Sequence, residues 1–443
     1  MKISLSEHFN FKKLMRFVLP SIIMMIFTSI YSVVDGIFVS NFVGTTSFAA
    51  INLIMPPLMI FGAVGFMIGA GGSAIVARTL GEGDIGRANE YFSMLIYFIA
   101  ATGILLTAVG FFVIKPIAEV LGARGQMLDD CVLYGRILLL CLTPFMLQSA
   151  FQSFFVAAEK AKLGLAFTIA AGLANIILDA VFILACKWGL LGAALATGIS
   201  QCAGGILPLI YFCRKNGSLL RLTKAKPNLK ILLKACTNGS SELMTNISMS
   251  VVNILYNYQL MRLAGENGVA AYGFIMYVSF IFAAIFIGYS IGSAPIISYH
   301  YGAENQAELK NLFKKSILFV SAGGILLTAL AIGLATPLSE LFVGYDRALF
   351  ELTRHGFRIY AVSFLLIGFN IFGSAFFTAL NNGLISAVIS FLRTLLFQTG
   401  TILVLPLILG LDGVWIAVIA AEFLAAAVTA VFFIAKRKQF NYA

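Results

Sequence analysis

Long apolar stretches recur along the whole chain, and they constrain the fold more than any other feature. Each is long enough to cross the roughly 30 Å hydrocarbon layer of a bilayer as a helix rising about 1.5 Å per residue. The stretches are continuously apolar and lack the alternation of a membrane-barrel strand. We count twelve, at residues 14–39, 47–77, 91–114, 133–157, 163–186, 189–213, 231–261, 268–298, 313–335, 357–380, 384–409 and 412–435. The sequence therefore predicts an all-α integral membrane protein with twelve transmembrane helices.

Composition and charge agree with this class. Of the 443 residues, 60% are hydrophobic and 11% are charged, whereas soluble domains carry about 25% charged residues. The net charge is +11, and with both termini in the cytoplasm most lysines and arginines fall in loops on that side, as the positive-inside rule requires. We therefore expect a multi-pass protein of the cell (inner or plasma) membrane with both termini cytoplasmic. Its basic side chains should meet lipid headgroups and not nucleic acid.

The chain repeats itself with an offset of 221 residues. The stretch GILLTA occurs at residues 103 and 324, and the same register maps Gly81 onto Gly302. Each half holds six spans, an even number, so the two copies enter the membrane in the same orientation. We expect two homologous six-helix lobes related by a pseudo-two-fold axis along the membrane normal. The predicted domains are an N-terminal six-helix lobe at 1–213, a cytoplasmic basic linker at 214–230 and a C-terminal six-helix lobe at 231–443.

Two aspartates stand out because they lie inside predicted spans. Asp35 and Asp179 lie roughly 10 to 13 Å from the outer ends of their helices at 1.5 Å per residue, and Thr197 of the next span lies at the same level. Asn175, one turn before Asp179, shares its helix face. The second half has apolar, aromatic or glycine residues at the four equivalent positions. With no basic residue predicted at this level, the two carboxylates cannot both be ionised comfortably, so at least one should accept a proton near neutral pH.

These four residues form the predicted cation or proton site. Oxygen ligands suit Na⁺ as well as H⁺, and the sequence leaves the two ions open. The alternative, that the aspartates only join helices by hydrogen bonds, is weaker because intramembrane carboxylates are as a rule functional. For Asn175 and Thr197 alone, helix packing explains the residues equally well.

Other residues inside the spans leave more than one interpretation open. Pro20 bends the first span, and the bend is either a static kink or one that changes when the carboxylates are protonated. Arg393 and Glu422 lie near the midplane, and our first hypothesis is a structural ion pair between them. A substrate-cation role for Glu422 is the second hypothesis, and Glu242 receives no role.

The motifs of several other protein classes are missing. The six cysteines have no CxxC or metal-ligand spacing and the three histidines stand alone, so we expect neither disulfides nor a metal centre, apart from Na⁺ at the cation site. No GxxxxGK[ST] phosphate loop, HExxH motif or intramembrane nucleophile with a base occurs, so we expect no nucleotide-driven pump and no enzyme. No cofactor is expected, and H⁺ or Na⁺ is the coupling ion.

The N-terminal half resembles a known transporter family. Pro20 and Asp35 in the first span, the N-x-x-x-D pattern of Asn175 and Asp179, and GAALAT ending in Thr197 are similar to the multidrug and toxic compound extrusion (MATE) family. More narrowly, the chain resembles the DinF-like branch and its MepA-like members, and the resemblance covers the whole chain. It implies a V-shaped, two-lobed antiporter that exports cationic or amphipathic drugs in exchange for H⁺ or Na⁺ by alternating access, and so contributes to antibiotic resistance.

The resemblance also implies where ions and drugs bind. It assigns the cation and proton site to the four polar residues named above. Its partners are small-molecule drugs and the lipid bilayer, and we expect a monomer. Candidate substrate contacts are Thr28, Tyr31, Gln148, Gln152 and Glu422. The alternative function is a flippase for lipid-linked sugars, which would require basic residues in the cavity, where only Arg393 and Arg136 are candidates.

Overall fold

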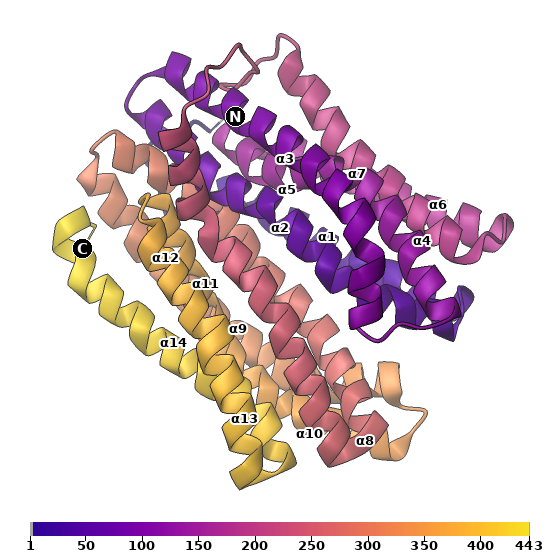
Figure 1. Cartoon of the computed structure of the whole chain (residues 1–443). Coiled ribbons are helices and arrows are strands. Elements are labelled where there is room, and N and C mark those ends of the chain that lie inside the picture. Colours follow the sequence, from indigo (N-terminus) through magenta and orange to yellow (C-terminus); the bar gives the residue numbers. More distant parts are fainter. Residues whose placement is uncertain (1–2, 443) are drawn as a thin grey trace.

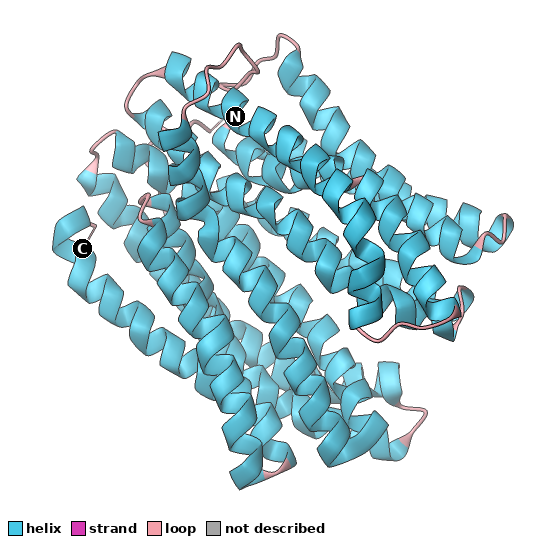
Figure 2. Cartoon of the chain, viewed as in Figure 1, coloured by secondary structure: helices cyan, strands magenta, loops and turns pink. Residues whose placement is uncertain are grey.

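The computed structural model describes residues 3–442, and every regular element in this range is helical (Figure 1, Figure 2). The outermost residues of the two predicted lobes, 1, 2 and 443, lie outside the described residues. The first lobe contains α1 (Phe11–Phe42), α2 (Thr45–Gly81), α3 (Ile85–Val120), α4 (Gln126–Leu140), α5 (Leu142–Ala157), α6 (Ala161–Asp179), η1 (Ala180–Ala185) and α7 (Gly189–Cys213). The second contains α8 (Leu229–Gly302), α9 (Gln306–Val343), α10 (Arg347–Tyr360), η2 (Ala361–Ser363), α11 (Phe364–Ala379), α12 (Gly383–Ser390), η3 (Phe391–Phe397), α13 (Gln398–Leu409) and α14 (Leu411–Phe440).

The helices account for the twelve predicted spans. Within the described residues, ten helical segments are long and apolar enough to cross a bilayer, and α4 with α5 forms an eleventh that is bent by 57°. The 74-residue helix α8 is two spans, because Gly265 breaks its geometry with φ 62° and ψ −151°, a conformation that glycine adopts at little cost. Dividing α8 there gives twelve spans, and the predicted fold class is confirmed.

Short polar side chains set the helix starts outside the apolar stretches. The side chains of Asn10, Asp84, Asn305 and Asp346 accept hydrogen bonds from backbone N–H groups in the first turns of α1, α3, α9 and α10. Such caps satisfy N–H groups that have no partner within the helix. They fix where these four helices begin.

The pseudo-two-fold axis is visible where the lobes meet. A Cβ atom added to Gly81 of α2 would lie 2.0 Å from the carbonyl oxygen of Tyr299 in α8, and one added to Gly302 of α8 would lie 2.1 Å from that of Arg78 in α2. Adding 221 to 78 and 81 gives 299 and 302, so the two contacts are equivalent copies of each other. The internal repeat of the sequence is therefore also a repeat of contacts across the lobe interface.

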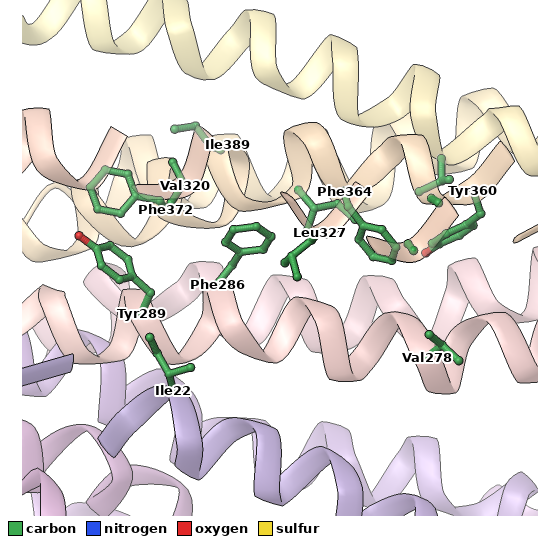
Figure 3. Close-up of a cluster of buried hydrophobic side chains, with 14 of the residues drawn as sticks. Ile22, Val278, Phe286, Tyr289, Val320, Leu327, Tyr360, Phe364, Phe372 and Ile389 are labelled. Carbon is green, nitrogen blue, oxygen red and sulfur yellow. The ribbon is translucent and has the colours of Figure 1, made fainter. Parts of the chain in front are cut away.

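Helix α1 packs in both lobes. Its first half, with Leu14, Val18 and Ile22, belongs to the apolar core of the C-terminal lobe, and Figure 3 shows Ile22 beside Phe286 and Tyr289 of α8. Its second half packs on α6 of its own lobe. Because lipid removes most of the hydrophobic drive between helices, such close packing is what holds membrane helices together. Helix α1 is thus a direct mechanical link between the lobes.

Candidate functional site

The polar residues predicted in the N-terminal lobe come from three elements. Asp35 lies in the second half of α1, Asn175 and Asp179 lie in the last two turns of α6, and Thr197 lies in α7. Asp179 is the last α-helical residue before η1, a π-helical turn. Such turns are rare and frequently mark functional positions, because they change the direction of side chains within a helix.

The structure brings these side chains together. The Asp35 carboxylate lies against the side chains of Asp179 and Asn175, and the Tyr134 hydroxyl of α4 lies against Thr197. Asn175 and Asp179 are buried, with 1% and 0% of their surface exposed. No described Lys, Arg or His forms an ion pair with either aspartate.

Several oxygens in this cluster have no hydrogen-bond partner among the described residues. They are Oδ1 of Asp35, both carboxylate oxygens of Asp179, Oδ1 of Asn175 and Oγ1 of Thr197. Two ionised carboxylates both accept and neither donates, so the contact between Asp35 and Asp179 becomes a hydrogen bond only when one of them carries a proton. Unsatisfied buried oxygens are costly, and a proton or a hard cation would satisfy them.

Residues that sequence reasoning missed complete this site. Tyr134 is 1% exposed and faces Thr197. Tyr277 of α8 approaches from the other lobe, its hydroxyl 3.5 Å from where a Cβ on Gly36 would lie, and it lies near the Asp35 carboxylate. A tyrosine inside a span is a weak sequence signal, because 15 tyrosines occur in the chain. The carboxylate site is therefore close enough to the C-terminal lobe to respond to its position.

A separate cavity of about 360 Å³ lies between the lobes. Met25, Phe66 and Gln152 line it from the N-terminal lobe, but most of its wall belongs to the C-terminal lobe. The rings of Tyr256 and Tyr272 stack in that wall with centroids 4.9 Å apart. None of the four residues of the carboxylate cluster lines this cavity, so the cluster and the large space are separate.

Arg393 and Glu422 form an ion pair on the wall of the cavity. Arg393 donates through Nε to both oxygens of Glu422, at 2.9 and 3.0 Å, and its Nη2 lies 2.9 Å from Oε1. Asn370 donates through Nδ2 to Oε2 at 2.7 Å, and Thr429 donates to the side-chain Oδ1 of Asn370 at 3.2 Å. The Glu422 side chain is 1% exposed. Its charge is thus compensated on two sides, which agrees with the pairing expected from the sequence.

Glu242 is the cavity residue to which the sequence assigned no role. It lies in α8, one turn after Gly239, and lines the cavity. Its carboxylate forms no hydrogen bond or ion pair with the described residues, whereas its backbone oxygen accepts from Asn246 at 2.8 Å. Since Arg393 and Glu422 pair with each other, Glu242 is the carboxyl group without a partner in the described wall of the cavity.

The remaining predicted residues lie in different places. Gln152 lines the cavity, and Gln148 lines a small crevice within the N-terminal lobe. Tyr31 packs against Gly172 of α6, and Thr28 donates to the Met24 carbonyl oxygen at 2.9 Å; neither lines the cavity. Pro20 is buried within α1, which runs without interruption from Phe11 to Phe42.

Comparison with known proteins gives the family. A family model described as MatE matches residues 20–181 and 243–402, one segment in each lobe and together more than half of the chain. The chain belongs to the MATE family. The two matched segments also agree with the internal repeat.

Relatives and solved structures resemble this MATE protein over almost its full length. It is 25% identical over 420 residues to the Multidrug export protein MepA of Staphylococcus aureus strain MRSA252. The aligned region covers 94% of this chain and 92% of the relative. The protein of the same name from Staphylococcus saprophyticus is 24% identical over 416 residues, covering 93% and 91%.

Two solved structures show the shared fold. One is described as the outward-facing conformation of a multidrug resistance MATE family transporter, with a TM-score of 0.93, 23% identity, and coverage of 99% of this chain and 98% of the other. The second, a MOP superfamily transporter from Pyrococcus furiosus, gives a TM-score of 0.91 at 23% identity with the same coverage. The two-lobed MATE fold is therefore the fold of this chain.

Proposed function

We propose that this MATE protein is a secondary active antiporter that exports cationic or amphipathic compounds in exchange for H⁺ or Na⁺. The observation that carries the proposal is the contact between two intramembrane carboxylates, Asp35 and the buried Asp179, which have no basic partner among the described residues. A site of this kind binds a proton or a hard cation when the ion has access to it. An ion gradient can then drive a conformational change. The relatives named multidrug export proteins support the choice of substrate class.

Alternating access of the two lobes is the transport mechanism that we infer. In the present conformation the lobes are in backbone contact at the end that carries the N-terminus, through Gly81 and Gly302, while the cavity lies between them. With the termini in the cytoplasm, this conformation is closed on the cytoplasmic side. Similarity to a structure described as outward-facing fits that orientation. Separation of the glycine contacts would open the cavity to the cytoplasm.

Coupling passes through α1 in this proposal. Helix α1 carries Asp35, contributes Met25 to the cavity, and packs its first half into the core of the C-terminal lobe. Binding of an ion at Asp35 and Asp179 removes the repulsion between the carboxylates and changes how α1 packs on α6. Because the same helix forms part of the cavity wall, the change in helix packing also alters the substrate cavity. The ion site and the cavity need no residue in common.

The chemistry of the cavity suits a cation with an apolar body. Glu242 offers an uncompensated negative charge, and the stacked rings of Tyr256 and Tyr272 offer aromatic faces. The carboxylate attracts organic cations by charge, and the rings, which begin fourteen residues further along the same helix, offer apolar and aromatic surface for the rest of the compound. We infer that the positive group of the exported compound lies near Glu242.

The flippase alternative has less support. A lipid-linked sugar phosphate would need an available basic side chain in the cavity, but Arg393 is paired with Glu422. Arg136 does not line the cavity, and its guanidinium lies over the Phe111 ring, 4.6 Å from the centroid. Arg393 is thus neutralised by its ion pair, and Arg136 lies outside the cavity.

Transport in proteoliposomes with separately imposed gradients tests the proposal. Purified protein is reconstituted, and movement of a cationic dye is followed with a pH gradient alone and with a Na⁺ gradient alone. One gradient should drive dye movement in the wild type, and neither should do so in the Asp35→Asn, Asp179→Asn double variant. Unchanged gradient-driven movement in that variant would contradict the coupling role.

A further inference from the structure

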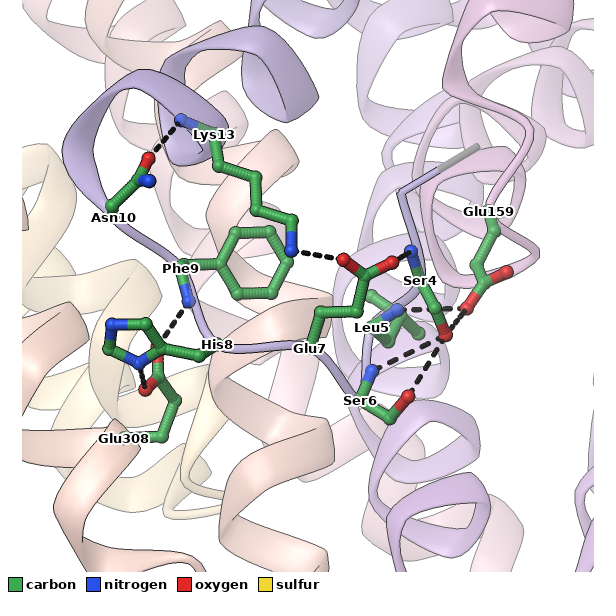
Figure 4. Close-up of polar contacts among 10 residues, drawn as sticks. All are labelled: Ser4, Leu5, Ser6, Glu7, His8, Phe9, Asn10, Lys13, Glu159 and Glu308. Carbon is green, nitrogen blue, oxygen red and sulfur yellow. Dashed lines mark hydrogen bonds and ion pairs between the residues drawn. The ribbon is translucent and has the colours of Figure 1, made fainter. Parts of the chain in front are cut away.

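The N-terminal segment before α1 contacts both lobes. This segment, residues 3–10, which we name the N-terminal strap, runs between Glu159 and Glu308 (Figure 4), and its Phe9 ring packs edge-on against His300, next to the contact of Gly81 with Tyr299. Leu5 and Phe9 are fully buried at 0% exposure. Both belong to the apolar core that also contains α8 and α9. The strap is therefore part of the packed structure.

One anchor of the strap is in the N-terminal lobe. Glu159 lies in the turn between α5 and α6, and its Oε1 accepts hydrogen bonds from the Ser4 hydroxyl at 2.7 Å and from the Leu5 backbone N–H at 2.8 Å. Hydrogen bonds to a carboxylate are stronger than those between neutral groups. Figure 4 shows Glu159 reaching toward the strap from its own turn.

The other anchor is in the C-terminal lobe, at the start of α9. Glu308 accepts from the Phe9 backbone N–H at 2.9 Å, and its other oxygen lies 2.6 Å from Nδ1 of His8. Asn311 and Lys315 donate to the Phe9 carbonyl oxygen at 2.9 and 2.5 Å. This anchor is continuous with the burial of the Phe9 ring in the core of the C-terminal lobe.

The distance between the anchors limits how far the lobes can separate. Leu5 and Phe9 are four residues apart, and a fully extended chain of that length spans about 14 Å at most. A turn at Ser4, closed by the 2.8 Å bond from its N–H to the Glu7 side chain, shortens the strap further. Both anchors can hold only while the lobes stay close at this end.

The linker before α8 crosses the equivalent helix on the other side of the pseudo-two-fold. Its backbone N–H groups at Arg221, Thr223 and Asn228 donate to Asn89, Ser93 and Met94 of α3. Subtracting 221 from 311 and 315, the strap's partners on α9, gives 90 and 94 on α3. Each lobe's first helix is thus preceded by a segment that crosses the same face of a third helix. In both cases the third helix belongs to the lobe opposite the helix that the segment precedes, so the strap and the linker make equivalent connections between the lobes.

We propose that the N-terminal strap is a latch that holds the lobes together at this end, and that its Glu159 anchor releases when they separate. The strap then stays on the C-terminal lobe, because the Glu308 anchor and the buried Phe9 ring hold it there. Weakening the latch raises the population of the conformation that is open at this end. The inference rests on the alternation of the lobes proposed above.

Distance measurements between spin labels test the latch. Exposed Lys162 of α6 and Lys310 of α9 flank the two anchors, and labels at these positions report the separation of the lobes at this end. The chain carries Lys162→Cys and Lys310→Cys, with its six native cysteines replaced by serine or alanine. Pulsed dipolar spectroscopy is recorded for this background and for the same chain with Glu159→Gln, Glu308→Gln or Ser4→Ala.

We expect the anchor variants to add a longer distance, with its population raised on the order of tenfold for Glu159→Gln and Glu308→Gln, since each loses charge-assisted bonds. Ser4→Ala removes one of the strap's two bonds to Glu159 and keeps the Leu5 N–H bond, so it should give a smaller change in the same direction. Glu304→Gln is the matched control, because Glu304 is exposed in the turn before α9 and has no side-chain partner among the described residues. Identical distributions in the background, both anchor variants and Ser4→Ala would overturn the latch.

A second pair of labels tests which anchor releases. A label at exposed Ser6 is paired in turn with the label at Lys162 and with the label at Lys310. In Glu159→Gln the distance from 6 to 162 should lengthen while that from 6 to 310 stays constant; the reverse pattern would contradict release at Glu159. Gradient-driven dye transport in the same vesicles is a separate readout. Its absence in the wild type would contradict the proposed function, whereas the distances alone decide on the latch.

Discussion

Gly239 of α8 lies directly against the backbone of Met67 in α2, where a Cβ on Gly239 would come within 1.8 Å of the Met67 carbonyl oxygen. Gly71 faces the same crossing, and its own added Cβ would lie 2.2 Å from the Ala235 carbonyl oxygen. The atoms in the way are backbone atoms, which cannot turn aside as a side chain can. The closed contact between the lobes thus depends on glycine at these positions.

Gly239→Ala should therefore force α2 and α8 apart. We expect a cost of about 1–3 kcal/mol to the present conformation, the usual range for overpacking, and a lower melting temperature of the purified protein. Gly273→Ala is the matched control in the same helix, because nothing lies within 4 Å of its added Cβ, and alanine favours a helix by up to about 1 kcal/mol. Equal melting temperatures for the two variants would contradict the close crossing.

Removing one member of the ion pair between Arg393 and Glu422 should be costly. Arg393→Met leaves Glu422 as an uncompensated buried charge, and breaking buried pairs in this way costs about 3–5 kcal/mol. Thermal unfolding in detergent measures the loss. The charge swap, Arg393→Glu with Glu422→Arg, should recover most of it if the pair is structural. A swap that folds no better than either single neutralisation would count against that role.

Asp179→Asn should abolish ion coupling while cargo binding remains. The amide cannot bind a proton at neutral pH, and the carboxylate cluster shares no residue with the cavity. We expect gradient-driven dye transport to fall at least about tenfold, as for loss of a functional intramembrane carboxylate, with an unchanged dye dissociation constant by fluorescence anisotropy. Asp129→Asn, at an exposed position in the first turn of α4, is the control. A parallel loss of dye binding in Asp179→Asn would show that the two sites are one.

Glu242→Gln should weaken binding of cations selectively. Loss of the uncompensated charge in the cavity removes an attraction that we expect to be worth roughly tenfold in affinity for a monocationic dye, about 1.4 kcal/mol. An uncharged compound of similar shape provides the control, and its affinity should change little. Titration calorimetry of both compounds measures the difference. The placement of the positive group near Glu242 is wrong if both affinities fall together.

Glu7 in the strap should stay ionised throughout the physiological range. Its side chain pairs with Lys13 and accepts from the Ser4 N–H, and these contacts lower the pKa of Glu7 below its ordinary value of 4.5. A carboxyl with a lowered pKa contributes stability above the unfolded pKa and loses it as the pH falls through the folded pKa. Glu7→Gln should therefore leave the pH profile of transport unchanged between about pH 6 and 8. A shifted profile in that range would contradict this.

Much of the fold was predictable because the bilayer leaves few choices. Apolar length predicted the spans, and the repeat with an offset of 221 predicted the lobe symmetry that the contacts of Gly81 and Gly302 display. Finer geometry was not predictable from composition: residues 133–157, expected as one span, bend by 57° between α4 and α5 at Cys141. Hydropathy carries no information on such a bend, which depends on how the neighbouring helices pack.

The site was predictable only at positions where an ionisable side chain lies inside a predicted transmembrane span. Asp35 and Asp179 stood out because carboxylates are rare inside spans, and their depths suggested a common level. The cavity could not be located from the sequence, because its wall combines helices from both lobes whose relative positions are a tertiary property. The same reason hid Tyr277, which reaches Asp35 from the opposite lobe. The strap was missed because eight residues ahead of the first span carry no hydropathy signal.

The separation of the cavity from the carboxylate cluster has an evolutionary consequence. Under the proposed mechanism, a mutation in the cavity wall can change which compounds are exported without changing the step that draws energy from the ion gradient. A mutation near Asp35 or Asp179 would instead alter the energy supply for all exported compounds at once. Under selection by a new drug, adaptive substitutions are therefore expected mainly in the C-terminal lobe, which forms most of the cavity wall. Few are expected at Asp35 and Asp179.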